Sequence, residues 1–97
     1  MTSELRDNGP YQTADQARTQ FDNITDGIPI STPADLHGLH SLVLLEAATI
    51  AGIELSVFER DILGQVAEVL DSESVQVLAG LLIRARIAAT ETAAGGR

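Results

Sequence analysis

The stretch TPADLHGLHSLVLLEAATIAG, residues 32–52, carries the clearest helix signals in the chain. Thr32 is suited to cap a helix, because its hydroxyl oxygen can accept a hydrogen bond from the first turn. Pro33 fits the first helical position, where no backbone N–H is needed, and Asp35 favours the positive end of the helix dipole. A glycine follows the last turn, as is common where helices end. These signals predict a helix over residues 33–51.

The apolar residues of this helix are not confined to one side. The main apolar face is expected to hold Leu36, Leu39, His40, Val43, Ala47, Ile50 and Ala51. Leu42 and Leu45 project roughly 90–180° away from that face, at about 100° per residue. A helix that is apolar on several sides is usually central in its fold or covered by a second chain. We therefore expect Leu42 and Leu45 to contribute to an interface.

Three other segments also show helical periodicity and start signals. Thr13 with Gln16, and Ser56 with Glu59, are spaced as capping boxes at the start of helices over 13–23 and 57–70. The segment 71–74, DSES, supplies caps and first-turn acids for a last helix over 73–92. No run alternates with period two for long enough to indicate a strand. The sequence thus predicts an all-α fold, a small antiparallel helical bundle of one short N-terminal helix and three longer helices.

The length of 97 residues favours one domain, because two would each be too small. Polar residues without periodicity predict a flexible arm over 1–12, ahead of a single helical domain over 13–92. The glycine- and alanine-rich residues 93–97 are expected to form a disordered tail. No basic and apolar leader is visible, and the longest apolar run, 42–53, is too short to span a bilayer. We therefore expect a cytoplasmic protein without a membrane partner.

The composition is acidic and lacks both cysteine and lysine. Fourteen acids against six arginines give a formal net charge of −8, which argues against binding a nucleic-acid backbone. The absence of cysteine excludes disulfides and thiolate metal sites. Arginine as the only long basic residue, together with many alanines, points to a high-G+C genome such as that of an actinobacterium or one of its phages.

The residues that could carry chemistry are few. His37 and His40, three positions apart, could share a metal ion, but a zinc site needs three or four protein ligands. His40 also falls on the apolar face, so we interpret it as a core histidine and expect no metal. No nucleophile motif or phosphate-binding glycine loop is present, and the carboxylates lie in caps or on polar faces. The sequence therefore indicates a protein that is not an enzyme and has no cofactor.

The last two helices carry more apolar residues than one face each requires. For the helix over 57–70 the expected core face is Phe58, Ile62, Leu63, Val66, Val69 and Leu70. For the last helix it is Val75, Leu78, Leu82, Ala85 and Ala89, with Leu81 and Ala88 beside it. Ile83 and Ile87 then form a separate ridge, and Gly80 allows close approach of a second chain. The predicted interface residues are Leu42, Leu45, Gly80, Ile83 and Ile87.

The segment 65–75 resembles a bacterial helix-turn-helix, since a small residue, Ala67, precedes a polar turn with a capping serine. The resemblance implies that Ser74 and Gln76 would face the bases of DNA. The segment departs from the motif at Asp71, where a glycine is usual. It also lacks a basic residue near the start of the reading helix.

Three hypotheses for function follow from these features. The first is a non-enzymatic protein–protein interaction or assembly module that associates with itself, such as a phage or mobile-element accessory protein. The second is an acidic inhibitor, an antitoxin or DNA mimic that binds a basic protein through Glu59, Asp61, Glu68, Asp71 and Glu73. The third is a helix-turn-helix DNA-binding regulator.

Overall fold

A computed structural model describes the backbone of residues 8–95 and the side chains of residues 8–90. These residues form four helices, α2 (Ala14–Ile24), α3 (Pro33–Ile50), α4 (Val57–Val69) and α5 (Ser72–Gly95), and no strand. The all-α prediction is confirmed, and every predicted helix boundary lies within three residues of the observed one. Arm residues 1–7 and tail residues 96–97 lie outside the described residues. Within residues 8–95, no helix is long and apolar enough to cross a membrane.

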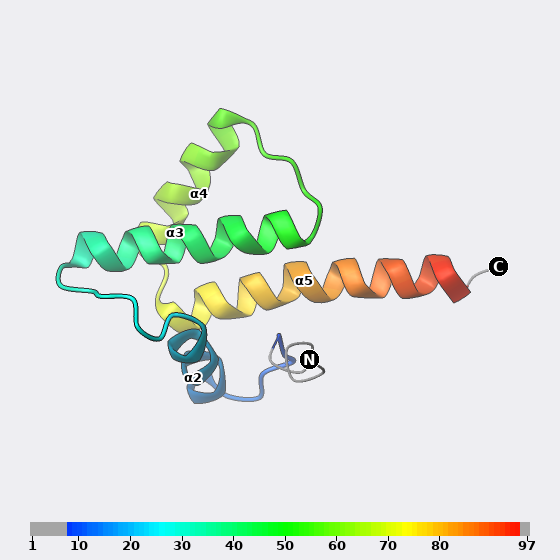
Figure 1. The fold of residues 1–97 in the computed structure, drawn as a ribbon, viewed down its shortest axis with the longest axis horizontal. Helices are drawn as coiled ribbons and strands as arrows, with labels where there is room; N and C mark the ends of the chain where they lie inside the picture. Colours follow the sequence, from blue (N-terminus) through cyan, green and yellow to red (C-terminus); the bar gives the residue numbers. More distant parts are fainter. Residues whose placement is uncertain (1–7, 96–97) are drawn as a thin grey trace.

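The helices α3 and α5 lie side by side and run in the same direction (Figure 1). Between them in sequence, α4 returns the chain from the end of α3 to the beginning of α5, which is the reversal that short connections favour. The first turn of α4 stands away from α3, whereas its last turn lies against it (Figure 1). The short helix α2 packs against α5, and α4 packs mainly against α3. The C-terminal half of α5 extends beyond the end of α3 (Figure 1).

Hydrogen-bonded caps fix where the helices begin. Thr32 Oγ1 accepts from Asp35 N at 3.1 Å, and Asp35 Oδ2 accepts from Thr32 N at 3.2 Å, which completes a capping box. Ser56 and Glu59 form the same reciprocal pair, at 3.1 and 2.9 Å. The predicted capping box at the start of α4 is thus confirmed, and at the start of α3 the predicted cap Thr32 forms a capping box with Asp35 that the sequence analysis did not predict.

At the other two helix starts the caps differ in detail. Thr13 accepts from Gln16 N, but the Gln16 side chain accepts from Gln12 N, one residue before the predicted position. Asp71 caps α5 by accepting from Ser74 N at 2.8 Å. Each cap satisfies N–H groups that the first turn of a helix leaves without partners.

The core lies where α2, α3, the end of α4 and the beginning of α5 meet. Its buried apolar cluster is Phe21, Leu39, Leu44, Ala67 and Val75, with Val43, Leu63 and Leu70 packed against it. Leu44 and Ala48 of α3 are buried although the sequence analysis left them off the main face, and Ile50 is exposed although it was placed there. The buried face of α3 is therefore rotated from the predicted one, toward α4.

The predicted core face of α5 is largely wrong. Leu78 is 40 % exposed, and Ala85 and Ala89 are exposed, although all three were expected to face the bundle. The residues that do face it are Ser72, Val75, Gln76, Ala79 and Gly80, continued by the half-buried Ile83 and Ile87. Ile83 and Ile87 therefore do not form a free ridge pointing away from the bundle. Of the predicted core face, Val75 is buried and Leu82 is half-buried, as expected. Because both sides of α5 are apolar, periodicity alone did not decide which side faces the bundle along the rest of the helix.

The predicted core face of α4 is half wrong. Leu63, Val66 and Leu70 are at least half-buried, as expected. Phe58, Ile62 and Val69 are exposed, Val69 by 82 % of its surface. Only the side of α4 that touches α3 is covered, because no other helix of the described chain packs closely on it.

Residues 8–11, predicted as part of a flexible arm, pack along α5. The Tyr11 hydroxyl accepts a hydrogen bond from Gln76 Nε2 at 2.9 Å. A Cβ added at Gly80 would collide with the carbonyl oxygen of Asn8, so this glycine is needed where the two segments touch. The close approach predicted at Gly80 is real, but it is made by this chain's own N-terminal segment.

Candidate functional site

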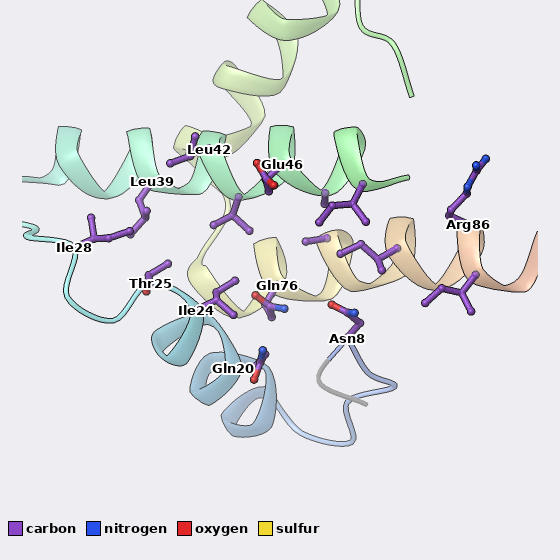
Figure 2. A pocket seen from close by; sticks show the side chains of 16 residues that line it. Asn8, Gln20, Ile24, Thr25, Ile28, Leu39, Leu42, Glu46, Gln76 and Arg86 are labelled. Carbon is purple, nitrogen blue, oxygen red and sulfur yellow. The ribbon is translucent and has the colours of Figure 1, made fainter. Parts of the chain in front are cut away.

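An open apolar groove of about 690 Å³ runs between α3 and α5, with α2 and the loop after it closing one end. Its walls are mostly branched aliphatic side chains, as the close view shows (Figure 2). The largest of them are Ile24, Ile28, Leu39, Leu42, Ile50, Ile83 and Ile87. Grooves of this volume with apolar walls and a few polar groups are typical of binding sites.

Three of the five predicted interface residues line this groove. Leu42 of α3 is 56 % exposed and lines the groove, as do Ile83 and Ile87 of α5. Leu45 lines a separate hollow on another side of α3, beside the loop 52–55. Gly80 lies against Asn8. The structure thus brings Leu42, Ile83 and Ile87 together and places the other two elsewhere.

Gln76 is the most deeply buried polar residue of the groove. It is 2 % exposed and lines the groove from α5, with its amide group among the side chains shown in Figure 2. Its Nε2 donates to the Tyr11 hydroxyl, but its Oε1 has no hydrogen-bond partner among the described residues. Sequence reasoning missed this residue as a groove component, because the predicted phase of α5 placed it outside the bundle.

Two charged side chains line the part of the groove that is distant from α2. Glu46 of α3 is exposed and Arg86 of α5 is also exposed (Figure 2). A Cβ added at Gly52 would lie 3.5 Å from Arg86 Nη1, so the guanidinium crosses to the C-terminal end of α3. A cation there faces the negative end of the α3 dipole.

His40 and Ser72 form a buried hydrogen-bonded pair outside the groove. His40 Nε2 lies 2.9 Å from Ser72 Oγ, and His40 Nδ1 lies 3.2 Å from the carbonyl oxygen of Ala67. A carbonyl can only accept, so Nδ1 carries the proton and Nε2 accepts from the serine. The Phe21 ring meets the imidazole edge-on at 5.4 Å between centroids. With His40 only 1 % exposed, the pair ties α3 to the α4–α5 corner and presents no surface to a substrate.

The other histidine does not complete a metal site with His40. The two ring centroids are 6.5 Å apart, and both nitrogens of His40 already have partners. No cluster of three or more potential ligand side chains exists in the part of the chain that the structure describes.

Several of the acids proposed to mimic DNA are used within the fold. Glu59 accepts from the backbone at the start of α4, and Glu73 Oε1 lies 3.7 Å from Arg18. Hydrogen bonds from the side chain and the backbone of Ser74 hold the pKa of Asp71 below its ordinary value. These carboxylates are therefore only partly free to meet a basic protein.

The helix-turn-helix resemblance meets a similar obstacle at its reading helix. Gln76, one of the two residues expected to face the bases, is buried and bound to Tyr11. The face of α5 that it occupies is turned toward the bundle, so this residue is not available to a base edge.

Comparison of the chain with protein-family models, with curated proteins and with solved structures finds no match.

Proposed function

We propose that this chain is a non-enzymatic protein–protein interaction module that pairs with a second copy of itself through the outer face of α5. This outer face is the row Leu78, Leu81, Ala85 and Ala88, all exposed. The observation that carries the proposal is that the row is apolar and uncharged, with Leu81 48 % exposed. Its steps of three and four residues are those of a coiled-coil seam.

The charge of the chain favours this face for self-association. Two copies with a net charge of −8 repel one another, and the repulsion is least where neither surface carries a charge. In a two-fold dimer the same face appears on both subunits, so each apolar contact is made twice. Covering the exposed part of each leucine contributes on the order of 1 kcal/mol. An accessory or assembly role in a phage or mobile element would suit such a small self-pairing module.

The proposal replaces the residues first expected to anchor the contact. Ile83 and Ile87 face the groove, whereas Leu78 and Leu81 point away from the bundle. The last helix is still the proposed contact element, with its other face outward.

Sedimentation equilibrium on matched single variants tests the proposal. We expect a dimeric wild type, a monomeric Leu81→Glu variant and a dimeric Leu42→Glu variant, because Leu42 is similarly exposed but lies in the groove. Circular dichroism confirms that each variant remains helical. A wild type that is monomeric at high micromolar concentration, or equal loss of the dimer in both variants, contradicts the proposal.

A further inference from the structure

The side of α4 that points away from α3 is apolar and uncovered. Phe58 and Val69 are 71 % and 82 % exposed, and Ile62 between them is 39 % exposed. At about 100° per residue, these three residues lie within about 40° of one another around the helix axis, so they form one row, the outer face of α4. Gln65, also exposed, adds an uncharged amide to the row. An exposed apolar patch with a polar border is typical of a protein–protein contact.

Two free carboxylates border this face. Asp61 and Glu68 are seven residues apart, so they point within about 20° of the same direction and lie about 10 Å apart along the axis. Both are exposed, and neither forms an ion pair among the residues that the structure describes. The one base of α4, Arg60, lines the hollow beside the loop 52–55 instead. The border of the outer face of α4 is therefore negative, and no cation of α4 balances it.

The position of α4 leaves this face open to a partner that encloses it. The helix packs mainly on α3, and its first turn, which holds Phe58, stands clear of α3 (Figure 1). Phe58 and Val69 are eleven residues apart, so the face is about 16 Å long, or three turns. A protruding amphipathic helix of this length is the kind of element that lies in an apolar groove of another protein.

We infer that α4 docks its outer face into an apolar groove of a different, basic protein. Phe58, Ile62 and Val69 fill the groove. Two lysine or arginine side chains on its rim, about 10 Å apart, meet Asp61 and Glu68. Opposite charges placed in this way select the partner and fix its orientation. The contact uses α4 alone, so it leaves the outer face of α5 free for the proposed self-association.

Two other occupants fit this face less well. A second copy of the chain brings the same two carboxylates and a net charge of −8 to the contact, so the two copies repel one another. Helices that lie in the surface of a membrane carry lysine or arginine beside their apolar face, where α4 carries Asp61 and Glu68. A basic protein with an apolar groove satisfies both the apolar row and its charged border.

The test starts from a phage-displayed library of designed helical hairpins, whose two helices form a groove. The groove positions vary among alanine, leucine, isoleucine and valine, and the rim positions vary among lysine, glutamine and glutamate. The library is selected on the full chain in low salt, where charge pairs are least screened. We expect the selected hairpins to carry two lysines, two helical turns apart, on one rim. Failure to select any hairpin, or selection without rim lysines, overturns the inference.

The local origin of the charge preference is tested with two double variants of equal net charge. Asp61→Asn with Glu68→Gln should weaken the selected hairpin about fivefold in isothermal titration calorimetry. Asp15→Asn with Asp26→Asn removes two exposed carboxylates from α2 and the turn after it, and should change the affinity by less than about twofold. Equal weakening by the two double variants would show that binding follows the net charge of the chain, which refutes the role of the α4 border.

The apolar contact is tested with Phe58→Ser and Leu81→Ser, two exposed positions on different helices. We expect Phe58→Ser to weaken the hairpin at least about tenfold, and Leu81→Ser to leave its affinity unchanged whether or not the chain dimerises. Circular dichroism confirms that both variants remain helical. Unchanged binding to Phe58→Ser would overturn the inference. Binding of the wild type to neutral phosphatidylcholine vesicles that is lost in Phe58→Ser would assign the face to a membrane and overturn it as well.

Discussion

Replacing the buried histidine His40 by alanine should remove much of the stability of the fold. The imidazole is 1 % exposed and makes two hydrogen bonds, to Ala67 O and Ser72 Oγ. Its loss leaves a buried carbonyl and a buried hydroxyl without that partner, and opens a cavity beside Phe21. Taken together, we expect a loss of about 3–5 kcal/mol. A domain of this size has only about 5–15 kcal/mol in total, so His40→Ala should be close to unfolding.

Urea denaturation followed by circular dichroism measures this loss, with His37→Ala as the matched control. His37 lies one turn earlier on α3, is half-buried and forms no hydrogen bond in the described part of the chain. We expect His37→Ala to cost about 1 kcal/mol or less. Ser72→Ala should cost about 1–2 kcal/mol in the wild type, and clearly less when His40 is already alanine, since the two side chains share one hydrogen bond. Equal losses in the two histidine variants would refute the role assigned to the buried pair.

Three further predictions concern glycines and caps. Gly80→Ala should destabilise the fold by about 1–3 kcal/mol, because the added Cβ collides with the N-terminal segment. Gly38→Ala should stabilise it by about 0.5–1 kcal/mol, because Gly38 lies inside α3 with open space around its Cβ. Melting temperatures that change in the same direction in both variants would contradict this prediction. Ser56→Ala should cost about 1 kcal/mol by removing the α4 cap, and an unchanged urea midpoint would show that the cap is dispensable. The pKa of Asp35 is lowered chiefly by the Ser31 N–H, so its contribution is complete above the unfolded-state pKa of about 3.9 and is lost as the pH falls through the lower folded-state pKa. Asp35→Asn should make the free energy of unfolding less dependent on pH below about 3.9. An unchanged pH dependence in that acidic range would contradict the role given to the Asp35 carboxylate.

The helix boundaries could be predicted from the sequence because they depend on neighbouring residues. Thr32 with Asp35 and Ser56 with Glu59 form their capping boxes whatever the rest of the chain does. Helical periodicity in four segments, with no run of period two, also predicted the correct all-α class. These properties depend on residues that are close together in the sequence, so the sequence alone is enough to predict them.

The orientation of each helix about its axis could not be predicted in the same way. The two sides of α5 are both apolar, one with Ile83 and Ile87 and the other with Leu78 and Leu81, so hydrophobic periodicity does not decide which side is buried. The deciding contacts come from distant segments: Asn8 against Gly80, and Tyr11 bonded to Gln76. Asn8, Gly9 and Pro10 are turn-forming residues, and nothing in them by themselves indicated that this segment would pack along α5. The groove depends on which face of α5 is turned toward α3, so neither the groove nor the buried Oε1 of Gln76 could be predicted before the fold was known.

The attachment of α4 to a single neighbour has a consequence for how the protein opens. This helix packs mainly on α3, while α3 and α5 are held by each other and α5 also by α2. A unit with one supporting surface opens at lower free energy than the rest of the domain. The amide protons of α4 should therefore exchange with deuterated solvent before those in the middle of α3 and in the first half of α5. Such an opening would begin at the first turn of α4, which stands clear of α3 (Figure 1), and would spread toward the carbonyl of Ala67, where the imidazole of His40 holds the last turn.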